Sequence, residues 1–131
     1  MTLRPGVPRL MLAFVVLAIP ACTASITGDD PSTGLSITVL KGPIQPVARE
    51  GEDNSAPVED ATVRIRSSDG GGDAERRTGP DGSTRIPLKP GSYRIEVREC
   101  PGTLTLPTPE QADVQRGSLT PVVMMCDTGI R

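Results

Sequence analysis

The side chains best suited to covalent chemistry in this sequence are its three cysteines, Cys22, Cys100 and Cys126. A thiolate can act as a nucleophile, be oxidised to a disulfide or bind a metal ion. The sequence contains no histidine and therefore lacks the commonest metal ligand and the side chain best suited to acid–base catalysis at neutral pH. Catalytic sites of the Ser–His–Asp or Cys–His type are excluded, as are zinc sites that contain histidine.

Cys22 follows a segment that resembles a bacterial lipoprotein signal. Arg4 and Arg9 flank the start of an apolar run over residues 10–19, and this run is too short to cross a membrane. It ends in Leu-Ala-Ile-Pro-Ala-Cys, which is similar to a lipobox because an aliphatic residue lies three positions before the cysteine and a small one directly before it. The resemblance implies cleavage after Ala21 and a diacylglycerol on the thiol of Cys22.

Two other interpretations of this segment stay open. The chain could be secreted without lipid, with Cys22 as a free thiol, or the apolar run could be a buried helix of the core. Pro20 stands where a lipobox usually has a small or hydroxyl-bearing residue. If Cys22 carries a diacylglycerol, the two acyl chains of this lipid anchor the protein stably in a membrane. We then expect a lipid-anchored protein on the extracytoplasmic side of the cell membrane, with membrane lipid as a partner.

The rest of the sequence divides into a short tether and one β domain. Residues 23–34 are small and polar and, with Cys22, are predicted to form a flexible tether over 22–34 between the signal segment 1–21 and a domain over 35–131. Polar and apolar residues alternate in the domain, which is typical of half-buried strands. Strands are predicted near residues 35–40, 61–67, 74–78, 83–87, 92–98, 112–116 and 119–126. Gly- and Pro-rich turns between them favour a small antiparallel sandwich.

The alternation also predicts which side chains form the core. The residues expected to point inward are Ile37, Val39, Val63, Ile65, Ile86, Leu88, Tyr93, Ile95, Val97, Val114, Val122 and Met124. Tyr93 is the one aromatic residue after the signal segment. Because this core is lean, a covalent cross-link would help to stabilise it.

Cys100 and Cys126 can supply that cross-link if Cys22 carries lipid. An even number of cysteines outside the cytoplasm indicates a disulfide. The chain reverses twice between the strand 92–98 and the strand 119–126, which brings both cysteines to one end of the sandwich. The alternative is a pair of separate buried thiols.

Acidic residues in the turns are the remaining candidates for chemistry. Asp69, Asp73 and Asp81 could bind calcium, although their spacing is not that of an EF-hand and aspartate is common in turns. No residue pattern indicates a pocket that would raise a carboxyl pKa for acid–base catalysis. We therefore expect no enzyme activity, no cofactor and no metal site. The formal net charge of −2 gives no reason to expect nucleic acid as a partner.

Three segments resemble the carboxypeptidase regulatory-like domain. These segments are PVEDATV at 57–63, TGPDGS at 78–83 and IPLKPGSYRIEV at 86–97. The resemblance covers residues 35–131 and implies a seven-stranded, prealbumin-like Greek-key sandwich of the Ig-like group. The sequence departs from the family pattern at Thr84, where a large apolar residue is usual. It also departs at Gln45, where a subset of small secreted bacterial proteins of this fold has a cysteine.

This fold implies a role for Tyr93, whose ring should be buried while its hydroxyl bonds to the backbone near the preceding turn. The closing residues 127–131 show no strand alternation, so Arg131 pairs either with an acidic loop or with a partner. We expect a non-catalytic binding or scaffolding module at the cell envelope, with an envelope protein or a glycan as its ligand. The alternatives are a carbohydrate-binding module and a calcium-dependent adhesion module.

Overall fold

The computed structural model describes Thr2, Gly6 and residues 26–131. The expected signal segment 1–21, apart from those two residues, and the expected acylation site Cys22 lie outside the described residues. The predictions made for them therefore stay predictions.

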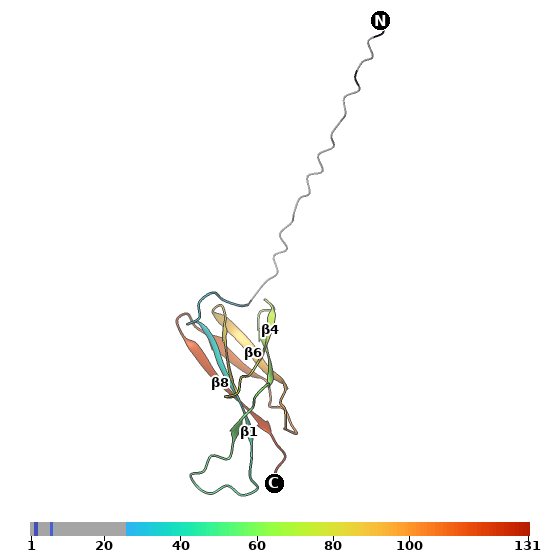
Figure 1. Ribbon diagram of the computed structural model, residues 1–131. Helices are drawn as coiled ribbons and strands as arrows, with labels where there is room; N and C mark the ends of the chain where they lie inside the picture. Colours follow the sequence, from blue (N-terminus) through green and yellow to red (C-terminus); the bar gives the residue numbers. More distant parts are fainter. Residues whose placement is uncertain (1, 3–5, 7–25) are drawn as a thin grey trace.

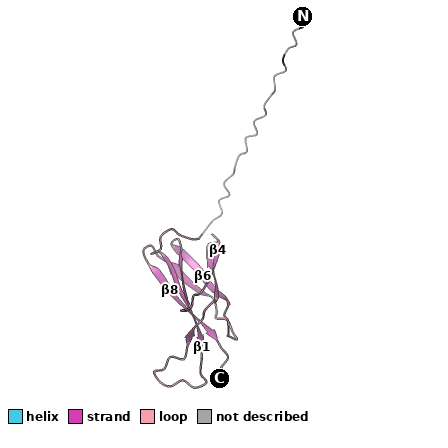
Figure 2. Cartoon of the chain, in the orientation of Figure 1, coloured by secondary structure: helices cyan, strands magenta, loops and turns pink. Residues whose placement is uncertain are grey.

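The described chain consists of strands joined by turns and loops (Figures 1 and 2). The strands are β1 (Gly34–Gly42), β2 (Ala56–Pro57), β3 (Thr62–Ser67), β4 (Asp73–Arg77), β5 (Ser83–Pro87), β6 (Gly91–Glu99), β7 (Glu110–Val114) and β8 (Leu119–Asp127). Within residues 26–131 we find no helix with the length and apolar character needed to span a membrane.

One sheet is built around β1. The short strands β2 and β5 pair antiparallel with β1 and lie one after the other along it, opposite Leu40 and Lys41 and opposite residues 34–38 respectively. The last strand, β8, pairs with β1 in parallel over nine residues. The close approach of β1 to β5 requires a glycine at position 34, because a Cβ atom there would lie 2.0 Å from the carbonyl oxygen of Ile86.

The other sheet has the order β4-β3-β6-β7, and all of its pairings are antiparallel. A register shift between Thr62 and Val63 marks an irregularity at the start of β3. The chain passes from one sheet to the other between β2 and β3, β4 and β5, β5 and β6, and β7 and β8. These crossings place the two sheets face to face as a sandwich.

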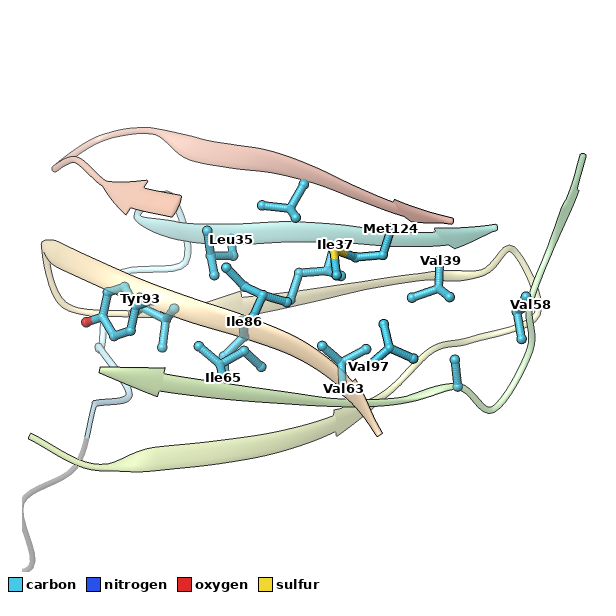
Figure 3. Close-up of a cluster of buried hydrophobic side chains, with 14 of the residues drawn as sticks. Leu35, Ile37, Val39, Val58, Val63, Ile65, Ile86, Tyr93, Val97 and Met124 are labelled. Carbon is cyan, nitrogen blue, oxygen red and sulfur yellow. The ribbon is translucent and has the colours of Figure 1, made fainter. Parts of the chain in front are cut away.

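The core lies between the sheets and contains all twelve residues that the alternation predicted to be buried (Figure 3). Six further hydrophobic residues of this core were not among the predicted ones: Ile26, Leu35, Val58, Ala61, Cys100 and Cys126. Figure 3 shows Tyr93 and Val58 near opposite ends of this core. Each buried Val- or Ile-sized side chain contributes about 1.5–3 kcal/mol relative to an exposed one.

The all-β sandwich fold is confirmed, with two differences of detail from the sequence-based expectation. The two-residue strand β2 was not predicted, because alternation cannot be recognised over so short a segment. The β1–β8 pairing is parallel, whereas we expected an entirely antiparallel sandwich. Alternation reports which face of a strand is buried, and it carries no information on the direction of the neighbouring strand.

The segment from Ile26 to Gly34 is packed against the sandwich, which corrects the expected flexible tether over 22–34 for the part that the structure describes. Ile26 is only 5% exposed and belongs to the core cluster. The Gly28 N–H donates to the carbonyl of Pro87, and the Lys89 N–H donates to the carbonyl of Ile26. The polar composition of this segment did not predict the docking, because the docking depends on one apolar side chain and on backbone hydrogen bonds.

The sandwich has two distinct ends, visible in Figure 1. The end that we call the N-terminal end is formed by the segment 26–33 and by the turns 68–72, 88–90 and 115–118. The opposite end, which we call the disulfide end, is formed by the loops 43–55, 58–61, 78–82 and 100–109 and by the closing residues 128–131.

Candidate functional site

Cys100 and Cys126 form a disulfide at the end named after it. Their Cα atoms are 6.7 Å apart, and 26 positions separate them in the sequence. Cys100 follows β6 in one sheet and Cys126 lies in β8 of the other, so the bond joins the two sheets directly. The two chain reversals predicted from the sequence bring the cysteines together in this way.

Hydrogen bonds organise the loop 43–55 beside the disulfide. The side-chain oxygen of Asn54 accepts hydrogen bonds from the N–H groups of Ile44 (3.0 Å) and Gln45 (2.9 Å). The side-chain amide of Asn54 donates in turn to the carbonyl of Gln45 at 3.2 Å. Asn54 thus closes the neck of this loop without a covalent bond.

The disulfide end also carries the exposed apolar side chains of the described chain. The large hydrophobic residues with substantial exposure there are Ile44, Val47, Leu104, Leu106, Val123 and Met125. Val47 and Leu104 are the most accessible, at 76% and 78% exposure. All of them lie in the loops of the disulfide end or between the middle of β8 and that end. Several exposed apolar side chains at one end of a domain mark a candidate interaction surface.

A shallow hollow lies within this surface, lined by Gly42, Pro43, Asn54, Met125, Asp127 and Arg131. Arg131 and Asp127 form an ion pair at 3.1 Å along its side. The hydrogen bond from Arg131, with one from the N–H of Gly129, lowers the pKa of the Asp127 carboxyl. Of the two expectations for Arg131, pairing with an acidic group is the one observed, although that group closes β8 and does not belong to a separate loop.

The outer edge of β8 borders the same surface. At the two ends of the β1–β8 pair, the Gly34 N–H donates to Ser118 and the Thr128 N–H donates to Gly42. Since alternate residues of a parallel strand bond to the same neighbour, Val123 and Met125 direct their N–H and C=O groups away from β1. Further along this edge, Asp127 is already bonded to Thr105, and Pro121 has no N–H to offer.

Asp69, Asp73 and Asp81 do not come together as a calcium site. Asp69 lies in the turn 68–72 at the N-terminal end and Asp73 directly follows it, whereas Asp81 lies in the turn between β4 and β5 at the disulfide end. Each carboxylate is engaged locally: Asp69 accepts from Ser67 and Gly71, Asp73 from Arg64, and Asp81 from Ser83. Within residues 26–131, no group of three Asp, Glu or Cys side chains is placed to hold a metal ion.

Tyr93 has the environment that its position in the fold predicts. Its ring is 3% exposed, and its hydroxyl donates to the carbonyl of Lys89 at 2.5 Å. Burial raises the pKa of the Tyr93 hydroxyl, with a smaller contribution from the charge of Asp69. Tyr93 is the only aromatic residue among those described, so the surface of residues 26–131 carries no exposed aromatic ring.

The sandwich is similar to two solved structures, those of a minor pilin and of a fimbrial protein. One is GBS52, the minor pilin of the Gram-positive pathogen Streptococcus agalactiae, with a TM-score of 0.57 and 14% identity over 73% of this chain and 44% of that one. The other is the fimbrial protein FimP from Actonomyces oris, with a TM-score of 0.50 and 14% identity over 77% of this chain and 31% of that one.

At 14% identity these similarities show the fold alone, an Ig-like β-sandwich. The chain spans less than half the length of either protein. No protein-family model matches the sequence, and no curated protein is similar to it. The fold is consistent with the prealbumin-like sandwich implied by the resemblance above, while membership of the carboxypeptidase regulatory-like family stays a prediction.

The sequence reasoning did not predict the apolar disulfide end. One signal was present: residues 122–126 (VVMMC) are apolar without interruption, and an uninterrupted run in a strand places apolar side chains on both of its faces. Only the inward half of this run was assigned to the core. Val47, Leu104 and Leu106 lie in loops, where no periodicity reports exposure.

Proposed function

We propose that this protein is a non-catalytic, extracytoplasmic binding module that is anchored in the cell membrane by an acylated Cys22 and binds a protein of the cell envelope. The observation that carries the proposal is the gathering of exposed apolar side chains at the disulfide end. An envelope protein can bury such side chains together with the backbone groups of Val123 and Met125 on the edge of β8.

The state of the carboxylates supports a role without catalysis. The pKa values of the Asp69, Asp73 and Asp81 carboxyls are all lowered, chiefly by side-chain hydrogen bonds from Ser67, Arg64 and Ser83 respectively. A general acid that works near neutral pH needs a raised carboxyl pKa instead. The two solved structures with a similar fold are a minor pilin and a fimbrial protein, which favours a module without catalytic activity.

The alternative functions have less support. A carbohydrate-binding module generally stacks sugars on exposed aromatic rings, whereas Tyr93 is buried. A calcium-dependent adhesion module would need converging carboxylates, whereas Asp81 lies at the opposite end from Asp69 and Asp73. We therefore propose a protein as the ligand in preference to a glycan or a metal ion.

The anchoring part of the proposal is tested by intact mass spectrometry of the protein extracted from membranes. We expect a chain that begins at Cys22, carries a diacylglycerol and lacks two hydrogens because of the disulfide. The Cys22→Ser variant should carry no diacylglycerol, because serine has no thiol to accept it. An acyl-free protein with three titratable thiols would contradict the proposal.

The binding part is tested by chemical cross-linking in intact cells. We expect a cross-linked partner with the unmodified protein, and its loss in the double variant Val123→Ser/Met125→Ser. The matched control, Glu75→Ser/Arg94→Ser, changes two exposed residues on the outer face of the other sheet and should keep the partner. Equal cross-linking in all three proteins, or none in any, would argue against the disulfide end as the binding surface.

A further inference from the structure

The docking of Ile26 fixes where the sandwich begins. Its side chain is 5% exposed within the core cluster, and its carbonyl accepts a hydrogen bond from the Lys89 N–H at 3.1 Å. Thr27 pairs with Leu88, and the hydroxyl of Thr33 accepts a hydrogen bond from the N–H of Gly117 at 2.8 Å. The segment 26–33 is therefore an integral part of the N-terminal end.

Chain length then limits the distance between the domain and a lipid on Cys22. Only residues 23–25 separate Cys22 from Ile26 in the sequence. Whatever path these residues take, the four Cα–Cα steps from Cys22 to Ile26 span at most about 14 Å, since a fully extended chain advances by about 3.3–3.6 Å per residue. A tether over the whole of 22–34 would have allowed about three times this distance.

We propose that the N-terminal end of the sandwich rests against the lipid headgroups, so that the domain stands on the membrane with a fixed polarity. This inference rests on the acylation of Cys22 proposed above and adds an orientation to it. A nine-residue strand such as β1 or β8 is about 30 Å long, so the disulfide end is held roughly 30 Å above the bilayer surface.

The chemistry of the N-terminal end suits a polar lipid surface. The end carries both signs of charge, with Asp29 and Asp30 beside Lys89 and Arg116 around a shallow hollow. Hydrogen bonds from Ser32 and Thr33, together with the charge of Arg116, lower the pKa of the Asp30 carboxyl. The exposed large hydrophobic residues of the described chain lie elsewhere. This end therefore matches zwitterionic headgroups and is not built to enter the hydrocarbon.

The orientation can be measured by energy transfer from a dye on the protein to acceptors on lipid headgroups. The acylated full-length protein is reconstituted into phosphatidylcholine vesicles, with the dye on a single added cysteine. Lys89→Cys places the dye at the N-terminal end, and Glu50→Cys places it on the loop 43–55 at the disulfide end; both positions are exposed. The unmodified protein should take up no dye, because its three thiols are already used.

We expect several-fold more efficient transfer from Lys89→Cys than from Glu50→Cys. A matched pair of variants carries a flexible Gly/Ser insertion of about 20 residues between Ser25 and Ile26, which adds a mean span of about 25 Å. In this pair the transfer from position 89 should fall towards that from position 50. Adding anionic phosphatidylglycerol should leave the ratio of the two transfer efficiencies unchanged, since tether length and not net charge holds the N-terminal end against the headgroups.

The possible failures are distinguishable. If the protein does not float with the vesicles and its mass lacks the lipid, the proposed anchoring is wrong and the inference falls with it. If the protein is acylated and floats, but the two dye positions transfer equally without the insertion, the anchoring stands and the fixed orientation is overturned. The fixed orientation would also be overturned if the insertion left the ratio of the transfer efficiencies from positions 89 and 50 unchanged.

Discussion

The hydroxyl of Thr78 connects two segments at the disulfide end of the core. Thr78 is 3% exposed; its hydroxyl donates to the carbonyl of Val58 at 2.5 Å and accepts from the N–H of Ala61 at 2.9 Å. The residues 58–61 form the crossing from β2 to β3, one of the four between the sheets, and Asp60 adopts a φ of 60° there. One side chain thus supplies hydrogen bonds that a strand ladder would otherwise supply.

Replacing Thr78 by valine, which keeps the shape of the side chain, should lower the free energy of unfolding by about 1–3 kcal/mol, because two buried backbone groups lose their partner. Urea unfolding followed by circular dichroism measures this. The matched control is Thr103→Val, which removes a hydroxyl bonded to the Cys100 carbonyl at a half-buried position, where water can replace it. Equal losses in the two variants would contradict the argument.

At the scale of single residues, the sequence predicted burial well and hydrogen bonding in part. Period-two alternation placed Ile65 and Val97 in the core correctly, because the side chains of a strand point alternately to its two faces. The hydroxyl bond of Tyr93 was expected from the resemblance. The roles of Thr78 and Asn54 were not predicted, because each depends on a contact with residues at least nine positions away.

At the scale of elements, the disulfide joins the ends of two strands that no backbone ladder connects. β6 and β8 belong to different sheets, so the bond between Cys100 and Cys126 restrains their separation at one end. The lean core of this domain makes such a restraint valuable.

Removing the disulfide in the double variant Cys100→Ala/Cys126→Ala should lower the free energy of unfolding by about 3.5 kcal/mol in the chain-entropy model, given the length of the loop it closes. Urea unfolding of the Cys22→Ser protein, with and without the further changes, provides the measurement. Reducing the disulfide of the Cys22→Ser protein should give the same midpoint as the double variant. A midpoint that neither reduction nor mutation shifts would refute the prediction.

The strands were predictable because each carries its own pattern, whereas their partners were not. The first and last strands, β1 and β8, are about 80 residues apart in the sequence, and nothing local to either reports their parallel pairing. The docking of 26–33 was missed for a related reason, since Ile26 is a single apolar residue in a polar segment and its burial depends on the distant Leu88 and Lys89.

At the scale of the whole molecule, the titrating groups predict a broad plateau of stability. The chain has no histidine. The carboxyls of Asp30, Asp69, Asp73, Asp81 and Asp127 have lowered pKa values because hydrogen bonds stabilise their ionised forms. Stability from these groups is fully present above their unfolded pKa of about 3.9 and is lost as the pH falls through their folded values.

We therefore expect a constant free energy of unfolding between about pH 5 and 7, and a decline below about pH 4. The raised pKa of Tyr93 acts at the other extreme: its contribution is complete below the unfolded value of about 10 and is lost as the pH rises further. Urea unfolding at a series of pH values checks both limits, and Tyr93→Phe should remove the alkaline decline. A transition centred between pH 6 and 7 would contradict this prediction.

The candidate surface was beyond the reach of sequence reasoning at this scale. Its apolar residues come from the loops 43–55 and 100–109 and from β8, and only the folded sandwich brings them to one end. The proposed orientation could not be predicted either. From its composition the tether was expected to cover 22–34, and this would span about three times the distance from Cys22 to the docked Ile26.

The parallel pairing of β1 with β8 has a mechanical consequence for a protein held at one end and gripped at the other. A membrane anchor would pull β1 from its Gly34 end, and a partner on the disulfide end would pull β8 near Asp127 in the opposite direction. The force would then act along the two strands in opposite directions. The hydrogen bonds of the nine-residue β1–β8 pair would share this load and would not break one after another. Tension between the membrane anchor and a bound partner would therefore load the β1–β8 pair along its strands.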